Sequence, residues 1–260
     1  MIAMPGASHR GPLPPLDGEG RRIAENLKAH VVAVASEEHN VAHPEALERS
    51  ALHIEKVLSR LGYEVSREEF ETQGVKVRNL EAVIRGGSAD PAAIVVGAHY
   101  DSVAGAVGAN DNGSGVAALL ELARLLKRVQ PSKAELRLVF YVNEELPWSR
   151  TAKMGSLVHA QNLARQGRRV AAMLSLETIG CYSDQARSQR YPAPLSLLYP
   201  GTGDFVAFVG NLRSRRLVRQ AVGFSGRTRP FPRRAARFRI SSTMRRAPTT
   251  GPTGNTAGRR

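Results

Sequence analysis

Three short segments between residues 99 and 145 carry side chains that can bind divalent metal ions. They are His99-Tyr100-Asp101, the loop 110–115 with Asp111 near its start, and the pair Glu144-Glu145. Imidazole nitrogens and carboxylate oxygens are ordinary zinc ligands. In a pair of adjacent acids, one carboxylate can bind metal while the other takes a proton from water. Together these segments indicate metal-dependent hydrolysis.

Each segment taken alone has an ordinary structural explanation. A single His-x-Asp is most often a structural histidine, Asp111 alone fits a turn before a helix, and Glu144-Glu145 alone fits a solvated acidic loop. The three occur in order, however, and each one ends a strand-like run or opens a helix-like run. Their joint occurrence favours a metal site over three unrelated features.

The apolar periodicity predicts an α/β fold with a central mixed, mostly parallel sheet and helices on both faces. Helices are expected over 20–36, 44–61, 113–129 and 151–166, and strands over 64–73, 77–84, 94–100, 136–143, 170–179 and 205–210. Gly86-Gly87 is expected to close a hairpin, and Ser114 to cap a helix. Ligands of such sheets bind beyond the carboxyl ends of the strands. His99, Asp101, Glu144 and Glu145 fall at those ends.

The motifs resemble those of the co-catalytic di-zinc exopeptidases. This family includes bacterial leucyl aminopeptidases and vacuolar aminopeptidase Y, and it is related to glutaminyl cyclases and glutamate carboxypeptidase II. The resemblance extends over about residues 20–222 and implies their zinc aminopeptidase-like fold, a phosphorylase/hydrolase-type sandwich. It is carried by the segments 97–102 (GAHYDS), 108–115 (GANDNGSG), 143–145 (NEE) and 154–156 (MGS).

The resemblance implies a role for each acidic or imidazole side chain in these motifs. The implied cofactor is zinc, two ions for the family, and the implied reaction is hydrolysis of peptide N-terminal residues by metal-activated water. Glu144 is the implied general base, and Asp101 is the implied partner that orients His99. The implied metal ligands are His99, Asp111 as the bridge, Glu145 on the second zinc, and Glu177, where aminopeptidases most often have aspartate.

One departure from the family affects the second zinc. The family's last ligand is a histidine near the C-terminus, whereas the last of the seven histidines in this chain is His159. His9, His30, His39, His43 and His53 are expected to be surface residues. The first zinc position then keeps three ligands and the second keeps only Asp111 and Glu145, so impaired activity is expected. The alternatives are a glutaminyl-cyclase-like acyltransferase and a non-enzymatic relative that binds a peptide or partner.

The basic character of the chain is confined to its end. The formal net charge is +14, all 23 acidic residues lie at or before Asp204, and the 14 basic residues after it are all arginine. We expect a flexible leader over 1–19, a C-terminally incomplete catalytic domain over 20–222, and a disordered Arg/Pro-rich tail over 223–260. The tail could be a nucleic-acid-binding arm, an inert extension or the product of an altered reading frame, and the last is favoured.

Other features bear on location and partners. The longest apolar runs are strand-length, well short of the roughly 20 residues of a membrane span. Residues 1–20 have no apolar signal-peptide core. Cys181 is the single cysteine, so no intrachain disulfide is possible. We expect a cytoplasmic protein that acts on peptides without a membrane, and the oligomeric state stays open.

Overall fold

The protein is described from a computed structural model covering residues 15–131, 133–191, 197, 199–228 and 233–236. The chain divides into two compact units. One comprises residues 12–183, and the other comprises residues 184–260 together with 1–11. The segments singled out above as candidate metal ligands all belong to the unit 12–183.

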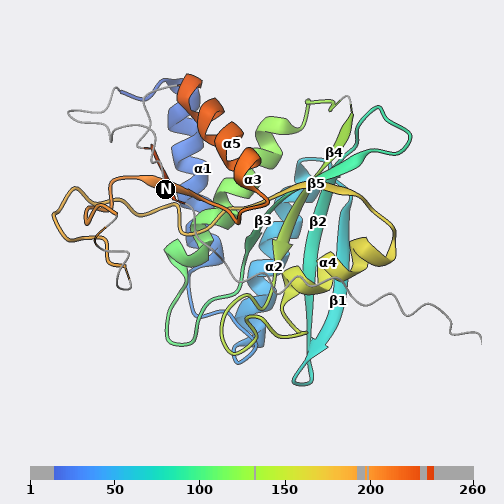
Figure 1. Ribbon diagram of the computed structural model, residues 1–260. Helices are drawn as coiled ribbons and strands as arrows, with labels where there is room; N and C mark the ends of the chain where they lie inside the picture. Colours follow the sequence, from blue (N-terminus) through green and yellow to red (C-terminus); the bar gives the residue numbers. More distant parts are fainter. Residues whose placement is uncertain (1–14, 132, 192–196, 198, 229–232, 237–260) are drawn as a thin grey trace, which may run out of the picture. The chain divides into compact units, whose positions relative to one another are not determined.

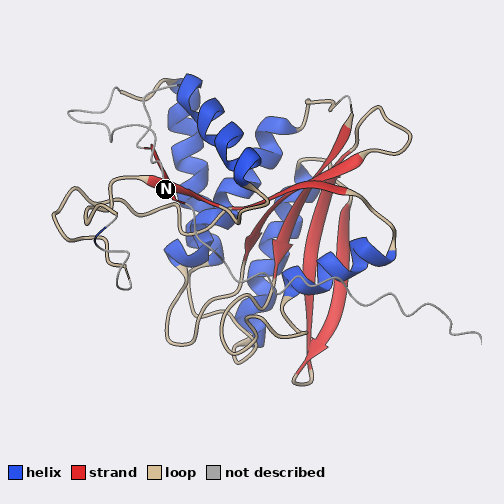
Figure 2. Cartoon of the chain, viewed as in Figure 1, coloured by secondary structure: helices blue, strands red, loops and turns tan. Residues whose placement is uncertain are grey.

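A five-stranded mixed sheet forms the centre of the unit 12–183 (Figures 1 and 2). Its strand order is β1-β2-β4-β3-β5, with β1, β2 and β4 antiparallel and β4, β3 and β5 parallel. The mixed α/β sheet is as predicted, and its parallel half carries the motifs. The strands are β1 Val65–Thr72, β2 Val75–Ile84, β3 Ala92–His99, β4 Ala134–Tyr141 and β5 Val170–Ser175.

Helices cover both faces of this sheet, as predicted (Figure 1). Successive side chains of β4 point to opposite faces of the sheet, and each face has its own hydrophobic core. Leu138 and Phe140 join the core that includes α2 and α3, whereas Val139 and Tyr141 join the core that includes Leu163 of α4. α1 packs against α3. The helices are α1 Gly18–Val34, α2 Pro44–Arg60, α3 Ser114–Leu126 and α4 Gly155–Arg165.

The hairpin between β1 and β2 turns at a different place from the one expected. Its turn is Gln73-Gly74, where both residues have positive φ and Gly74 has φ +79°. Gly86 instead lies against β4, where a Cβ atom would come within 2.2 Å of the Ala134 carbonyl oxygen. The Gly-Gly pair is therefore explained by close packing after β2 rather than by a turn.

The other unit contains β6 Val206–Val209, α5 Arg215–Thr228 and β7 Arg233–Ala236, and β6 pairs with β7 in parallel. α5 continues to Thr228 and β7 comprises Arg233–Ala236, so both elements include residues of the range 223–260 that was expected to be disordered. Arginine is a good helix former, and a proline at 230 cannot continue a helix. Residues 237–260 lie outside the described residues.

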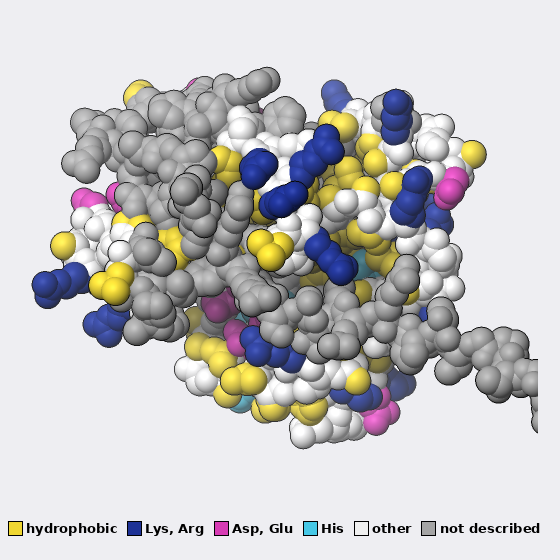
Figure 3. Space-filling model, in the orientation of Figure 1, with side chains coloured by type: hydrophobic (Ala, Val, Ile, Leu, Met, Phe, Trp, Pro, Cys, Tyr) yellow, Lys and Arg dark blue, Asp and Glu magenta, His cyan; other side chains and the backbone are white. Residues whose placement is uncertain are grey.

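Two further expectations concern the chain's start and its surface. Residues 1–14 of the expected leader lie outside the described part, while α1 already begins at Gly18, capped by the Asp17 side chain that accepts the Gly20 N–H. Within the described ranges, no helix is long and apolar enough to cross a membrane. Figure 3 shows one face of the molecule, with the described Lys and Arg side chains in dark blue.

Candidate metal centre

His99 is a buried residue at the centre of the candidate site. It ends β3, and only 2% of its side chain is exposed. Its Nδ1 lies 3.1 Å from the backbone oxygen of Asp101 and 3.4 Å from Asp101 Oδ1. A hydrogen on Nδ1 that is donated to Asp101 orients the ring so that Nε2 points away from Asp101. This arrangement fixes the tautomer of a ligating histidine in many metal sites.

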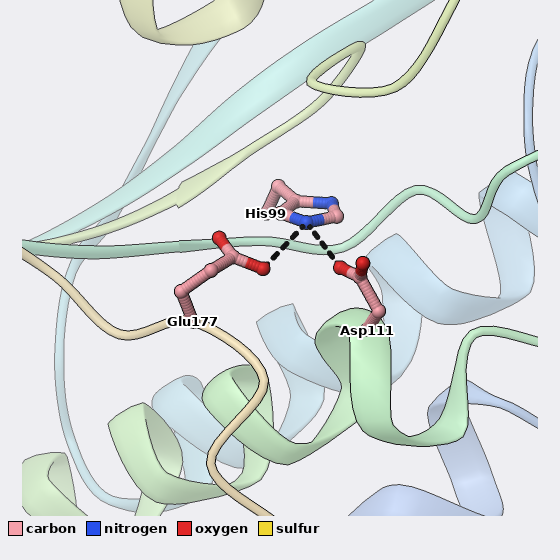
Figure 4. Close-up of side chains that lie close together, drawn as sticks. All are labelled: His99, Asp111 and Glu177. Atoms are coloured by element: carbon pink, nitrogen blue, oxygen red, sulfur yellow. Dashed lines mark hydrogen bonds and ion pairs between the residues drawn. The ribbon is translucent and has the colours of Figure 1, made fainter. Parts of the chain in front are cut away.

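Two carboxylates converge on His99 Nε2, as Figure 4 shows. Asp111 Oδ1 lies 3.1 Å from this nitrogen, and Glu177 Oε1 lies 3.5 Å from it. Asp111 belongs to the irregular turn Ala109–Gly113 before α3, and Glu177 follows the end of β5. One ligand atom from each of the three side chains lies within 4.8 Å of the others. The strand end and the two loops therefore meet at one point.

The turn before α3 also fixes the segment that carries Glu177. The side-chain amide of Asn112 donates to the Leu176 carbonyl at 2.8 Å. The hydroxyl of Ser114 accepts the Ile179 N–H at 3.0 Å. Glu177 lies between these two attachment points, so its backbone is anchored on both sides to the turn that carries Asp111.

The expected capping role of Ser114 is wrong. Ser114 is the first residue of α3, and its hydroxyl donates to the Asn110 carbonyl at 2.6 Å. The side-chain oxygen of Asn112 instead accepts the Gly115 N–H at 3.0 Å. Asparagine is among the preferred residues for bonding the free N–H groups at a helix start.

Glu144 and Glu145 reach the site from the end of β4. Their backbone N–H groups donate to the two oxygens of the buried Asp101 carboxylate, each at 3.1 Å. Glu144 Oε2 lies 3.9 Å from His99 Nε2. His99, Glu144 and Glu145 form a second group whose possible ligand atoms lie within 4.8 Å of one another. The five acidic residues singled out from the sequence therefore lie around His99.

Burial and crowding of like charges shift the titration of these groups. Burial raises the pKa of Glu144 to about 7 in spite of the nearby His99, and it also raises the pKa of Glu145. Burial alone would lower the pKa of the His99 imidazole, but the carboxylates of Asp101, Asp111 and Glu177 outweigh it and raise that pKa to about 12. The hydrogen bond with His99 lowers the pKa of Asp111. The site thus holds a marked excess of negative charge.

His39 was expected at the surface, and this expectation is wrong. The side chain is buried, with 1% exposed. Its backbone N–H donates to the Ser102 hydroxyl, and the Ser102 N–H donates back to the His39 carbonyl, both at 2.9 Å. This reciprocal pair fastens the connection between α1 and α2 to the chain that follows His99. Local sequence pattern carries no signal for it, because the partners are 63 residues apart.

The remaining described histidines lie outside the two candidate ligand groups. His30 and His53 are half-buried against each other between α1 and α2, so they too differ from the expected surface residues, whereas the side chain of His43 is exposed as expected. His159 lies in α4 near Tyr141. His9 is outside the described residues.

Residues 79–226, more than half of the chain, match the family described as Peptidase family M28. The chain is 43% identical over 183 residues to the uncharacterised protein YfbL of Escherichia coli, covering 67% of this chain and 55% of that protein. It is 38% identical over 97 residues to aminopeptidase YwaD of Bacillus subtilis, covering 37% of this chain and 20% of that protein. The chain thus spans about half or less of these relatives.

The same fold is found in the LapA aminopeptidase of Legionella pneumophila. The two structures superpose with a TM-score of 0.59 over 89% of this chain and 60% of that one, at 19% sequence identity. At this level of identity the likeness concerns the arrangement of helices and strands. It agrees with the mixed sheet and two helical layers of the unit 12–183.

Proposed function

Because the chain belongs to peptidase family M28, we propose that it is a zinc-dependent exopeptidase of the aminopeptidase type. The observation that carries the proposal is the convergence of Asp111 and Glu177 on Nε2 of His99. Histidine and carboxylate ligands at this spacing suit zinc. The similarity to aminopeptidase YwaD supports peptides as the substrate class.

The donor set fits a divalent cation. Five carboxylates surround one imidazole, and in the described part of the chain no Lys or Arg forms an ion pair with any of them. Such an excess of negative charge is unfavourable without a compensating cation. His99 and Asp101 are buried, while the side chains of Asp111 and Glu177 are about half exposed (52% and 45%). A cation held here would be reachable by a substrate.

The proposed ligands are assigned by position. His99, Asp111 and Glu177 would hold the first zinc, and Asp111 with Glu145 would contribute to a second, weaker position. Asp101 would orient His99 through Nδ1 and keep Nε2 free for metal. A bound zinc ion would polarise the peptide carbonyl and increase the acidity of a water molecule.

Glu144 is the proposed general base. Its carboxylate is close to the cluster without being hydrogen-bonded to His99, the distance to Nε2 being 3.9 Å. Glu144 would take a proton from the attacking water as the oxygen–carbon bond forms. It would then give the proton to the amine as the carbon–nitrogen bond breaks. The hydrogen bond from the Glu144 backbone N–H to Asp101 keeps the Glu144 carboxylate beside the ligands.

The test is hydrolysis of leucine p-nitroanilide by the full chain after chelation and zinc replacement. We expect zinc-dependent hydrolysis that falls by about 10²–10⁴-fold in Glu144→Gln, with zinc content unchanged. Glu69→Gln, an exposed acid on β1, is the matched control and should retain wild-type activity. Activity that survives Glu144→Gln would contradict the assigned mechanism. Ammonia release from an N-terminal glutaminyl peptide without leucine p-nitroanilide hydrolysis would favour cyclase chemistry.

A further inference from the structure

Asn143, the residue before the two glutamates, has an unusual backbone for its position. It is buried, with 1% exposed, and its φ is +61°. Residues other than glycine rarely occupy this left-handed region, and asparagine is one of the few that tolerate it. β4 ends at Tyr141, two residues before Asn143, and the next two backbone N–H groups, those of Glu144 and Glu145, donate to Asp101.

The side chain of Asn143 ties this turn to another strand. Its amide nitrogen donates to the Thr72 hydroxyl oxygen at 3.0 Å and to the Lys153 carbonyl at 3.2 Å. Thr72 is fully buried at the end of β1. Lys153 is itself attached to β1, because its Nζ donates to the Glu71 carbonyl at 2.7 Å. Both ends of the segment 143–153 are thus hydrogen-bonded to the last two residues of β1.

The same segment is also hydrogen-bonded to Asp101. The N–H groups of Glu144 and Glu145 both donate to that carboxylate. These bonds need the two N–H groups to point in the same direction, which depends on how the chain turns immediately before them. A turn that failed would leave a buried carboxylate without its donors, which is unfavourable for the folded chain.

We propose that Asn143 is a positioning residue for the acidic pair. Its left-handed backbone turns the chain, and its amide locks that turn to Thr72 and Lys153. Glu144 and Glu145 are thereby presented to Asp101 and to the cluster around His99. The effect on metal binding rests on the function proposed above, whereas the effect on the two N–H groups does not.

Substitutions at residue 143 separate the two parts of this role. Glycine permits the positive φ but removes both hydrogen bonds of the amide. Alanine removes the same bonds and is also strained at φ +61°. Gln73→Ala is the control, because Gln73 has φ +50° and is exposed in the β1–β2 turn. It reports the general cost of alanine at a positive φ, away from the site.

The first experiment is hydrogen exchange of the metal-free full chain, followed at the amides of residues 144 and 145. We expect exchange at least about tenfold faster in Asn143→Ala, an intermediate rate in Asn143→Gly, and the wild-type rate in Gln73→Ala. Wild-type protection in Asn143→Ala would overturn the proposal. An equal rise in exchange throughout the chain would also overturn it, because that pattern marks a general loss of stability.

The second experiment is titration of the same proteins with Zn²⁺. We expect the affinity to fall by about 10–100-fold in Asn143→Ala, as for other residues that support metal ligands. The fall should be smaller in Asn143→Gly. Wild-type affinity in Asn143→Ala would overturn the link to the metal site. If the wild-type chain binds no Zn²⁺, the proposed function fails, while the exchange result still decides whether Asn143 positions the acidic pair.

Discussion

The buried carboxylate of Asp101 accepts the backbone N–H of Glu145 at 3.1 Å. Its other oxygen accepts the Glu144 N–H, and the same oxygen lies 3.4 Å from His99 Nδ1. One carboxylate therefore joins the end of β3, which carries His99, to the segment after β4, which carries the acidic pair. The sequence predicted the contact with His99 but gave no indication of the two bonds to backbone N–H groups.

Replacing Asp101 by asparagine tests this connection. The amide nitrogen of Asn cannot accept a hydrogen bond, so one of the two N–H groups after β4 loses its acceptor. We expect Asp101→Asn to lower the affinity for Zn²⁺ by about 10–100-fold, measured by calorimetric titration. Asp90→Asn, at an exposed position after β2, is the matched control. Equal affinity in the two variants would show that Asp101 does not support the ligands.

The convergence of the candidate ligands could be predicted because it follows from the direction of the strands. β3, β4 and β5 are parallel, so residues just beyond their carboxyl ends meet at one edge. Apolar runs located these strands, and the polar residues at their ends gave His99, Asp101, Glu144 and Glu145. Glu177 lay inside a predicted strand and was assigned from the resemblance to the di-zinc exopeptidases. The spacing of the chain therefore contained most of the information about which side chains converge.

Other features could not be predicted, because they depend on contacts between distant residues. The burial of His39 depends on Ser102, and the position of Glu177 depends on Asn112 and Ser114. The hairpin turn was misplaced because Gly86-Gly87 has the composition of a turn. In the folded chain, Gly86 is needed instead for close packing against β4.

Gly155, at the start of α4, is predicted to be essential for packing. A Cβ atom there would lie 2.3 Å from both the Val142 carbonyl oxygen and Asn79 Oδ1. We expect Gly155→Ala to lower the free energy of unfolding by about 1–3 kcal/mol, measured by urea denaturation. Gly18→Ala is the control, since nothing lies within 4 Å of its added Cβ. Equal stability of the two variants would contradict the close contact of Gly155 with Val142 and Asn79.

The contact between α1 and α2 is predicted to weaken in acid. His30 Nδ1 and His53 Nε2 lie 3.2 Å apart, and burial lowers the pKa of both rings from 6.5. Because the unfolded chain takes up protons more readily than the folded chain, this contribution to stability is fully present above about pH 6.5 and is lost as the pH falls below it.

Urea unfolding at about pH 7.5 and about pH 5.5 measures this effect. The free energy of unfolding should fall between the two, and the fall should be smaller in the double variant His30→Gln/His53→Gln. If the double variant loses as much stability as the wild type, this histidine pair is not the source of the acid sensitivity.

The central claim is that His99, Asp111 and Glu177 together bind a metal ion. Its most direct test is calorimetric titration of the metal-free full chain with Zn²⁺, comparing the wild type with His99→Ala. We predict saturable binding of at least one Zn²⁺ per wild-type chain, weakened by about 100-fold or more in His99→Ala. That loss is at least as large as the effect of removing a residue that only supports a ligand. Equal binding in the two proteins, or no binding by the wild type, would contradict the claim.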